Sequence, residues 1–352
     1  MEIGVNISLT ERIRVGKMAN HKIKMIQQDE KIEGARVMEV TLGQKKFQTP
    51  FKSMNLPQSG HLLEVYQSAN DKLIRDSRDS QTVLNKLATK CRKDTINLII
   101  TMYTDTAITD ATLCDLENRI HPHTDVIVVP RWDGTLKIKT GSNLSDDLWS
   151  LSKRYIDEVR CMNGKLIIGN LPMNRPQSVI DTLVDRYFAE GITSFVLDYE
   201  ACNAPGKKHI VRGIAKKLIA GGFFEESLLY SINMRKTHDY GDINPADDLL
   251  SFTDGIDILG NYHMRGGGGK DHIAKIFNPS DWAYNSEEVG KKNHGDINSM
   301  NQISINKEAE IIKREILENG SVMKLARTKR GAQEYIQTYV QSTLDFGGLG
   351  WG

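Results

Sequence analysis

The sequence predicts an α/β protein built on a (β/α)8 TIM-like barrel, with an N-terminal extension and C-terminal helices. Three observations support this fold class: short apolar runs recur along the chain, each run ends in polar residues, and amphipathic segments separate the runs. Buried parallel strands have continuous apolar sequences, and strands that alternate with helices form a parallel sheet. The 352 residues exceed the roughly 250 that such a barrel needs, so additions to the barrel are expected.

The strands are expected in order along the chain. Residues 1–35 are polar and charged, and we expect an arm or an added helix there. A hairpin is predicted at 36–49, because Gly43 and its polar neighbours separate two apolar runs. One barrel strand is expected between residues 56 and 96, at residues 61–66. The other barrel strands are predicted at 51–53, 97–100, 125–129, 165–168, 194–197, 228–232 and 256–259.

Helices are expected between these strands. Ser145 is a suitable N-cap for one helix, and Asn244-Pro245 supply a suitable N-cap and first residue for another. A stripe of isoleucines predicts a further helix that ends near Gly320. We therefore assign residues 36–325 to the barrel and 326–352 to a helical tail. A doubly wound sheet would fit the same alternation, but the glycine-rich phosphate turn expected after its first strand is missing.

Composition and charge exclude several classes of protein. The four cysteines are widely separated, so no CxxC-type zinc site is predicted, and no metal or cofactor is expected. Scattered cysteines are typical of reduced thiols in the cytoplasm. No apolar run reaches the roughly 18–20 residues of a membrane span, and the N-terminus lacks the apolar core of a signal peptide. The formal net charge of +1 indicates that any nucleic-acid-binding surface is local.

Acidic residues follow several of the predicted strands. Asp105, Asp133, Asp198 and Glu200 lie where catalytic groups of barrels lie, at the carboxyl ends of strands. Alternation along a strand places Asp198 and Glu200 on the same face. Two facing carboxylates repel each other, so one pKa would rise, which suits acid–base chemistry. The alternative is that these side chains cap helices or pair with a neighbouring arginine such as Arg131.

Several segments of the chain occur in a characteristic order. They are 47–51 (FQTPF), 124–128 (TDVIV), 166–170 (LIIGN), 241–250 (GDINPADDLL), 255–259 (GIDIL) and the helix at 306–319. In this order they resemble the tRNA-guanine transglycosylase family, and the resemblance spans residues 36–325. It implies a barrel that exchanges a guanine in a nucleic acid for a free 7-deazaguanine base. In that family one aspartate attacks the ribose C1′ and a second handles protons.

The chain departs from the pattern of this family at its catalytic positions. The nucleophile position, the second acidic residue of the GVDMFD motif, falls on Gly260, whereas Asp257 matches the first. Asp105 lies in the nearest counterpart of the DSGGFQ segment, and Asp198 and Glu200 replace the GGLA turn. The catalytic candidates are therefore these four acidic residues, with a structural role as the alternative for Asp257. The family's zinc-binding cysteines are missing, and the region after the barrel is short. These two departures slightly favour DNA over tRNA as the substrate.

The resemblance also suggests how a base would be bound. Asp133 lies near the family's base-reading aspartate and could accept hydrogen bonds from a guanine-like base, with Trp132 or Tyr199 as a stacking surface. Arg265 opens the glycine run 265–270, which could cradle a phosphate or form a plain loop. The other candidates for substrate binding are polar residues at strand ends: Asn170, Asn261 and His263.

Basic residues form two groups that could contact phosphates or simply be solvated helix faces. One group recurs at four-residue spacing and shares a helix face, and the other lies near the C-terminus. The groups are Lys208, Arg212 and Lys216, and Arg327, Lys329 and Arg330.

We therefore predict a cytoplasmic pentosyltransferase that acts on tRNA or DNA and takes a free 7-deazaguanine or guanine base. It needs no membrane partner, and a homodimer or heteromer would suit the family. Two alternatives stay open: a barrel enzyme that acts on a small phosphorylated or glycosidic substrate, and a non-catalytic, nucleic-acid-binding partner subunit. Salt-sensitive binding of nucleic acid separates the first alternative from the other two readings.

Overall fold

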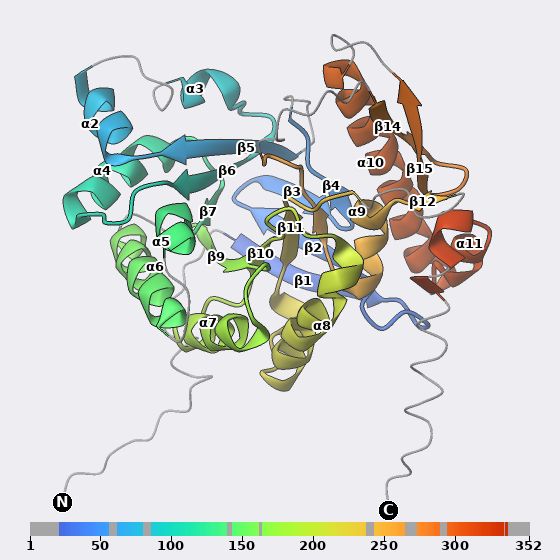
Figure 1. Cartoon of the computed structure of the whole chain (residues 1–352). Helices are drawn as coiled ribbons and strands as arrows, with labels where there is room; N and C mark the ends of the chain where they lie inside the picture. Colours follow the sequence, from blue (N-terminus) through green and yellow to red (C-terminus); the bar gives the residue numbers. More distant parts are fainter. Residues whose placement is uncertain are drawn as a thin grey trace, which may run out of the picture.

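The computed structural model shows an α/β fold with a mostly parallel central sheet (Figure 1). The fold class expected from the sequence is confirmed at this level. The structure describes residues 21–55, 62–79, 86–138, 143–161, 164–236, 243–264, 273–288, 294–333 and 335–336.

The central sheet contains the strands expected from the apolar runs and one further short strand, β8, which was not expected. They are β4 (Phe51–Lys52), β5 (Leu62–Ala69), β6 (Ile96–Tyr103), β7 (Val126–Val128), β8 (Arg131–Trp132), β9 (Leu166–Pro172), β10 (Phe195–Asp198), β11 (Leu229–Ile232) and β13 (Ile258–Leu259). The order is β4-β13-β11-β10-β9-β7-β6-β5, β8 pairs with β6, and all these pairs are parallel. Strand β5 confirms the strand that was expected at residues 61–66.

The two outermost strands of this order, β4 and β5, also meet. Met54, just after β4, forms a parallel bridge with Leu63 of β5. The backbone N–H of Met54 donates to the carbonyl of Leu62 (2.8 Å), and the N–H of Glu64 donates to Met54 (2.9 Å). The order of strands around the sheet therefore continues from β5 to the segment that follows β4.

Helices follow most of these strands and lie around the outside of the sheet (Figure 1). They are α2 (Asp71–Asp79), α3 (Leu87–Lys90), α4 (Asp110–Ile120), α5 (Asp133–Ile138), α6 (Leu144–Arg160), α7 (Gln177–Ala189), α8 (Ala204–Ala220), η1 (Phe224–Glu226), α9 (Asp247–Leu250), η2 (Ser251–Asp254), α10 (His294–Asn319), α11 (Met323–Arg327) and η4 (Arg330–Ala332). Thr109 and Asn203 start α4 and α8 as N-caps, each accepting a hydrogen bond from the first turn.

A small antiparallel sheet precedes the parallel one. Its strands are β1 (His21–Gln28), β2 (Arg36–Leu42) and β3 (Lys45–Gln48). Strands β2 and β3 confirm the predicted hairpin, whose turn contains Gly43 at φ 61°. Residues 21–28, expected as an arm or a helix, instead pair with β2 along its length. This correction has a tertiary cause, because a strand with so many polar residues is stabilised by its partner rather than by its own propensity. The rest of the expected arm, residues 1–20, lies outside the described residues.

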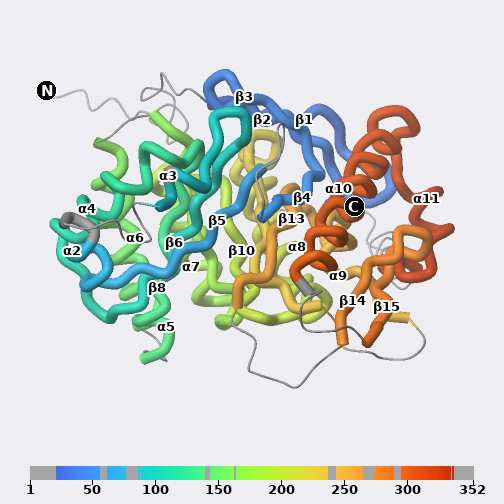
Figure 2. Tube along the Cα trace, turned by 90° about the horizontal axis from the view of Figure 1, so that it is seen from above, coloured from blue at the N-terminus to red at the C-terminus, as the bar shows by residue number. Residues whose placement is uncertain are grey.

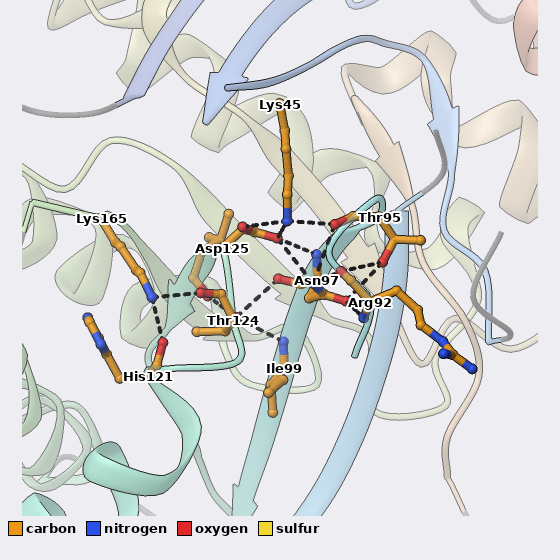
Figure 3. A network of polar contacts seen from close by, with 10 residues as sticks. Lys45, Arg92, Thr95, Asn97, Ile99, His121, Thr124, Asp125 and Lys165 are labelled. Carbon is orange, nitrogen blue, oxygen red and sulfur yellow. Dashed lines mark hydrogen bonds and ion pairs between the residues drawn. The ribbon is translucent and has the colours of Figure 1, made fainter. Parts of the chain in front are cut away.

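Polar contacts attach this small sheet to the amino ends of the parallel strands (Figure 3). Lys45 Nζ reaches both carboxylate oxygens of Asp125 (2.8 and 2.7 Å) and the carbonyl of Thr95 (2.7 Å). Asp125 also accepts the backbone N–H of Asn97 (2.7 Å), which lies in β6. Lys165 Nζ donates to the carbonyl of Thr124 (2.8 Å) nearby. These contacts occupy the amino ends of β6, β7 and β9, so the carboxyl ends remain for a site.

A third sheet packs on α10 and was not expected from the sequence. Its strands are β12 (Asn244–Pro245), β14 (Ile273–Asn278) and β15 (Ala283–Glu288), all antiparallel. In Figure 2 the pair β14 and β15 lies beside α10, and Asn301 of α10 accepts the N–H of Phe277 (2.8 Å). Among the described residues, no helix has the length and apolar character needed to cross a membrane.

Two expected helix starts are wrong. Helix α6 begins at Leu144 with Asn143 as the N-cap residue, so Ser145 lies within its first turn. Asn244-Pro245 form strand β12, and α9 begins only at Asp247. The partner of β12 is β15, almost forty residues further on, and such a distant partner leaves no trace in the local capping pattern.

The apolar side chains form two layers on the two faces of the parallel strands. Leu63, Val65 and Ala69 of β5 pack in the outer layer with the helices, whereas Leu62 packs in the inner layer with the small N-terminal sheet. This follows from the alternation of side chains along a strand. Some inner positions hold buried polar residues, such as Glu64, the third residue of β5, and Asp198, the last residue of β10.

A buried carboxyl group in the outer layer leads to a first prediction. Glu117 of α4 is fully buried and accepts the hydroxyl of Tyr155, and burial raises the pKa of Glu117 to about 7. Because this value exceeds the ordinary 4.5, stability from this group is complete below pH 4.5 and is lost as the pH rises through 7. Glu117→Gln is therefore expected to stabilise the protein at pH 8, by up to about 3 kcal/mol at about 1.4 kcal/mol per pKa unit.

Urea unfolding of the wild type and of Glu117→Gln at pH 4 and pH 8 checks this expectation. The stabilisation at pH 8 should largely disappear at pH 4, where Glu117 is protonated in both states. Asp157→Asn, at an exposed position of α6, serves as the control and should change little at either pH. Equal effects of Glu117→Gln at both pH values would show that its charge is not the cause.

Candidate active site

Three carboxylates converge on one buried arginine at the carboxyl ends of the strands. Arg131 of β8 binds Asp198 through Nη1 (3.0 Å), and binds Asp133 (2.9 Å) and Glu200 (3.0 Å) through Nη2. All four side chains are at most 6% exposed. The structure therefore brings together Asp133, Asp198 and Glu200, three of the acidic residues selected from the sequence. Asp198 and Glu200 both pair with Arg131, which is the alternative that the sequence left open, and their role in acid–base chemistry stays a prediction.

Burial and the neighbouring charges change the pKa values of Arg131, Asp133 and Glu200. Burial alone would lower the pKa of Arg131, but the charges of Asp198 and Glu200 outweigh it and raise this pKa. Burial raises the pKa of Glu200, with Arg131 opposing and Asp198 adding to the rise. Burial would also raise the pKa of Asp133, but hydrogen bonds and charges from Lys137 and Arg131 lower it. The two carboxylates thus have pKa values displaced in opposite directions, which is typical of acid–base sites.

The backbone at these strand ends adopts an uncommon conformation. Glu200 (φ 48°), Ala201 (φ 66°) and Asn233 (φ 55°) lie in the left-handed region, which non-glycine residues rarely adopt. The N–H of Glu200 donates to Asp198 Oδ1 (3.1 Å), and the N–H of Ala201 donates to the carbonyl of Asn233 (3.0 Å). Such conformations persist where surrounding contacts hold them, and they cluster at functional sites.

A second buried carboxylate, Glu64 of β5, was not selected from the sequence. It is 2% exposed and accepts hydrogen bonds from Ser53 Oγ (2.6 Å), the N–H of Asn261 (3.1 Å), the Tyr230 hydroxyl and His263 Nε2. A pattern in the sequence could have identified Glu64 as a candidate site residue. It is an acidic residue inside an apolar run, on the face opposite to Leu63 and Val65.

Its surroundings keep Glu64 ionised. Burial would raise the pKa of Glu64, but the charge and hydrogen bond of His263, together with Lys52 and Ser53, lower it to about 2. The His263 ring stacks on Tyr66, with ring centroids 4.7 Å apart and planes inclined by 7°. Glu64, Tyr66 and His263 thus form a compact group beside the Arg131 cluster.

Asn233 connects the two groups. Its Nδ2 donates to Asp198 Oδ1 (2.9 Å), and its Oδ1 accepts the backbone N–H of His263 (2.8 Å). A continuous chain of contacts therefore runs from Glu64 through His263 and Asn233 to Asp198 and its arginine. Buried networks of this kind rigidify the groups that they contain.

Several buried polar atoms in this region have no hydrogen-bond partner within the described part of the chain. They are Tyr66 Oη, Arg131 Nε, Asn170 Nδ2 and Glu200 Oε2. An unsatisfied buried polar group costs roughly 1–3 kcal/mol, so such atoms call for a ligand or ordered water. Arg131 and Asn170 also line a cavity of about 10 Å³, enough for about one water molecule. A larger hollow of about 240 Å³ is lined by residues of α10 between 310 and 318, and none of the atoms named above lines it.

Two of the predicted catalytic residues lie elsewhere. Asp257 forms a buried ion pair with Arg36 (Nη2–Oδ2 2.7 Å) at the amino end of β13, where it also accepts the N–H of Leu229 (2.8 Å). The structure therefore assigns Asp257 a structural role, which was the alternative. Asp105 accepts the N–H of Asp71 at the start of α2 (2.8 Å) and is not among the carboxylates on Arg131.

The two expected stacking rings face away from the carboxylates. Trp132 is 3% exposed and donates from Nε1 to Ser152 of α6 (3.0 Å), and Tyr199 is 1% exposed in the outer apolar layer. This corrects the expectation that either ring stacks on a base. Because side chains alternate along a strand, Trp132 and Tyr199 point outward where their neighbours Arg131 and Asp198 point inward.

The remaining predicted substrate-binding residues differ in their surroundings. Asn170 lies in β9 with its amide nitrogen unpartnered, as noted above. The Asn261 amide donates to Ser53 Oγ (3.0 Å) and accepts from Gln302 (3.0 Å), so it anchors α10 to the strands. Arg265 and the glycine run 265–270 lie outside the described residues.

The basic residues selected as phosphate contacts are partly engaged within the protein. Lys208 and Arg212 lie 3.6 and 3.7 Å from Asp254, and Lys329 donates to the carbonyl of Pro279 (2.7 Å). Lys216, Arg327 and Arg330 are exposed. Their contact with nucleic acid stays a prediction. Within the described ranges, no three His, Cys, Asp or Glu residues are grouped as ligands for a metal ion.

Gly260 occupies the position where the resemblance expects a nucleophile. A Cβ atom there would lie 2.0 Å from the carbonyl oxygen of Ser231, far inside van der Waals contact. An aspartate side chain therefore has no room at this position, because the obstacle is backbone rather than a movable side chain. Any carboxylate that reacts with a substrate must come from another strand end.

Comparisons with known proteins assign no family. No protein-family model matches the chain, and a search of curated proteins finds no significant match. Function must therefore be argued from the chemistry of the site.

Proposed function

We propose that this chain is a base-exchanging transglycosylase that replaces guanine in tRNA or DNA with a free 7-deazaguanine base, on a complete (β/α)8 barrel. The cluster of Asp133, Asp198 and Glu200 around Arg131 is the observation that carries the proposal. It lies at the carboxyl ends of parallel strands, where barrel enzymes hold their catalytic groups.

The strand contacts support the closed barrel. The parallel strands follow one another in chain order from β5 to β13, and β13 pairs with β4. The bridge between Met54 and Leu63 then joins the segment after β4 to β5. A closed sheet of this kind would direct the inner polar side chains toward one mouth.

Glu200 is the carboxylate best suited to react with the sugar. Base exchange builds positive charge at the ribose C1′, and a carboxylate can stabilise or trap that centre. One oxygen of Glu200 binds Arg131, whereas Oε2 lies 3.8 Å from Arg175 Nε and has no hydrogen bond within the described residues. In the proposed reaction Oε2 bonds to C1′ while the base leaves with the glycosidic electron pair. The incoming base then bonds to C1′ and releases the carboxylate.

Asp198 positions this carboxylate. Both of its oxygens are engaged, by Arg131, by the side chain of Asn233 and by the N–H of Glu200. It therefore fixes the left-handed turn that carries Glu200 rather than reaching the substrate. The unpartnered Asn170 amide and Tyr66 hydroxyl are suitable donors for the polar edge of a base. Lys137, whose side chain is 71% exposed, could contact phosphates beside them.

The experiment measures incorporation of radiolabelled guanine into bulk tRNA and, separately, into duplex DNA by the purified protein. Incorporation into one polymer is expected from the wild type, and Glu200→Gln should lower its rate by at least about 10³-fold. Glu310→Gln, at an exposed position of α10, is the matched control and should keep the wild-type rate. The polymer that is labelled identifies the substrate. Incorporation that survives Glu200→Gln would remove Glu200 from the mechanism.

A non-catalytic, nucleic-acid-binding partner subunit is the second candidate function. The steric exclusion of a side chain at Gly260 favours it, because the family's nucleophile cannot be accommodated there. Salt-sensitive binding of tRNA or DNA without any incorporation would support this second function over the first. If the protein bound neither polymer, both functions would be excluded.

A further inference from the structure

The histidine beside the carboxylate cluster is held in a fixed orientation. His263 Nε2 bonds to Glu64, the ring stacks on Tyr66 at 4.7 Å, and the backbone N–H is held by Asn233 Oδ1 at 2.8 Å. Glu64 is itself immobilised, since Ser53, Tyr230 and the N–H of Asn261 also donate to it. A carboxylate bonded to one ring nitrogen is a common means of orienting an imidazole for proton transfer.

The other ring nitrogen is left for another molecule. Glu64 engages Nε2 of His263 and not Nδ1, and the His263 side chain is 15% exposed, whereas that of Glu64 is fully buried. Solvent or a ligand can therefore reach the imidazole but not its carboxylate partner. Asn233 contacts both the backbone N–H of His263 and the carboxylate of Asp198, so His263 is one residue removed from the carboxylate cluster along this chain of contacts.

We propose that His263 is the catalytic acid–base group that exchanges a proton with the base, with Glu64 as its positioning residue. This inference rests on the proposed function and adds a second catalytic group to it. When the C1′–N bond breaks, its electron pair stays on the leaving base, which takes a proton from Nδ1 of the imidazolium. The incoming base then gives its N–H proton to the neutral imidazole as its nitrogen bonds to C1′. The proton is returned in each cycle, so no other reactant is needed.

A division of labour between Glu200 and His263 follows from the geometry. A carboxylate that bonds to C1′ cannot also exchange the proton of the base, so a second group is required. Glu64 cannot supply it, because its oxygens already accept four different donors in a buried position. The ionisable and charged groups around the imidazole are Glu64 and Tyr66 of β5, Lys52 of β4, Tyr230 of β11, Asp198 of β10 and Arg131 of β8.

The test measures the rate of release of labelled guanine from the polymer that the incorporation assay identifies, between pH 5 and 9. His263→Gln is expected to lower this rate by about 10²–10⁴-fold and to remove the limb of the pH–rate profile that belongs to the imidazole. Glu64→Gln should lower the rate less and displace that limb, because the imidazole loses its orienting charge. His123→Gln, at the amino ends of the strands, is the matched control and should keep both rate and profile.

A second measurement guards against a variant that fails to fold. In the wild-type protein, addition of free guanine should perturb the imidazole ¹⁵N signals of His263 but not those of His123. A His263→Gln protein that keeps the wild-type rate, or that loses rate equally at every pH, overturns the inference while leaving base exchange intact. A guanine titration that leaves the His263 signals unchanged overturns it too. A wild type without base exchange overturns the proposed function, and the role of His263 falls with it.

Discussion

Replacing Arg36 by methionine is expected to lower the free energy of unfolding by about 3–5 kcal/mol, the usual cost of breaking a buried ion pair from one side. Both side chains of the pair Arg36 and Asp257 are 1% exposed, and the guanidinium also donates to the carbonyls of Phe224 and Ser227. Burial already raises the pKa of Asp257 even with Arg36 beside it. Without the arginine, a carboxylate and two carbonyls lose their partner inside the protein. Urea unfolding at pH 7 measures the difference.

Two further variants make this result interpretable. Arg154→Met removes a partly exposed arginine that pairs with exposed Asp110, and it should cost less than about 1 kcal/mol. The double variant Arg36→Met/Asp257→Leu removes both charges and should recover part of the loss. If Arg36→Met were no more destabilising than Arg154→Met, the pair would not be holding the N-terminal sheet to β13.

Replacing Arg131 by methionine is expected to cost about 3–5 kcal/mol near pH 8, because three buried carboxylates would lose their shared cation. Burial already raises the pKa of Glu200, and the charges of Arg131 and Arg175 oppose this increase. Without Arg131, the pKa of Glu200 should rise further. A folded-state pKa above the ordinary 4.5 means that stability is complete below pH 4.5 and is lost as the pH increases. The deficit should therefore be smaller at pH 5 than at pH 8.

Thermal and urea unfolding at the two pH values test the role of Arg131. Lys137→Met is the matched control, because Lys137 pairs with the same Asp133 but its side chain is 71% exposed, and it should cost less than about 1 kcal/mol. Circular dichroism at pH 5 would establish that Arg131→Met still folds. A deficit of the same size at both pH values would indicate lost packing rather than uncompensated charge.

The sequence predicted that Asp198 and Glu200 would lie together, because side chains two residues apart share a face of a strand. The structure brings them together in another way, since β10 ends at Asp198, Glu200 lies in a left-handed turn (φ 48°), and both pair with Arg131. The same rule places Tyr199 on the opposite face, so it conflicts with the expectation that Tyr199 stacks on a base beside them. The same rule places the Trp132 ring on the face opposite to Arg131, so it also conflicts with the expectation that Trp132 stacks on a base. The orientation of both rings could therefore have been derived from the sequence.

Glu64 and His263 illustrate what local geometry cannot supply. They lie 199 positions apart in the chain, and each is unremarkable in its own segment. Their contact exists because β5 and the segment after β13 meet through the order of strands in the sheet. The same holds for Asp257, whose partner Arg36 belongs to a small sheet that the sequence predicted only as a hairpin.

By itself, the sequence determined the α/β class, the parallel strands and the polar residues at their ends, since these follow from periods of two and 3.6 residues along the chain. The tertiary structure alone decided which of those polar residues share a partner. It placed Asp133, Asp198 and Glu200 on Arg131, moved Asp257 to the opposite end of the strands, and left no room for a side chain at Gly260. The physical reason is that charges and steric contacts act through space, between strands whose order no local pattern encodes.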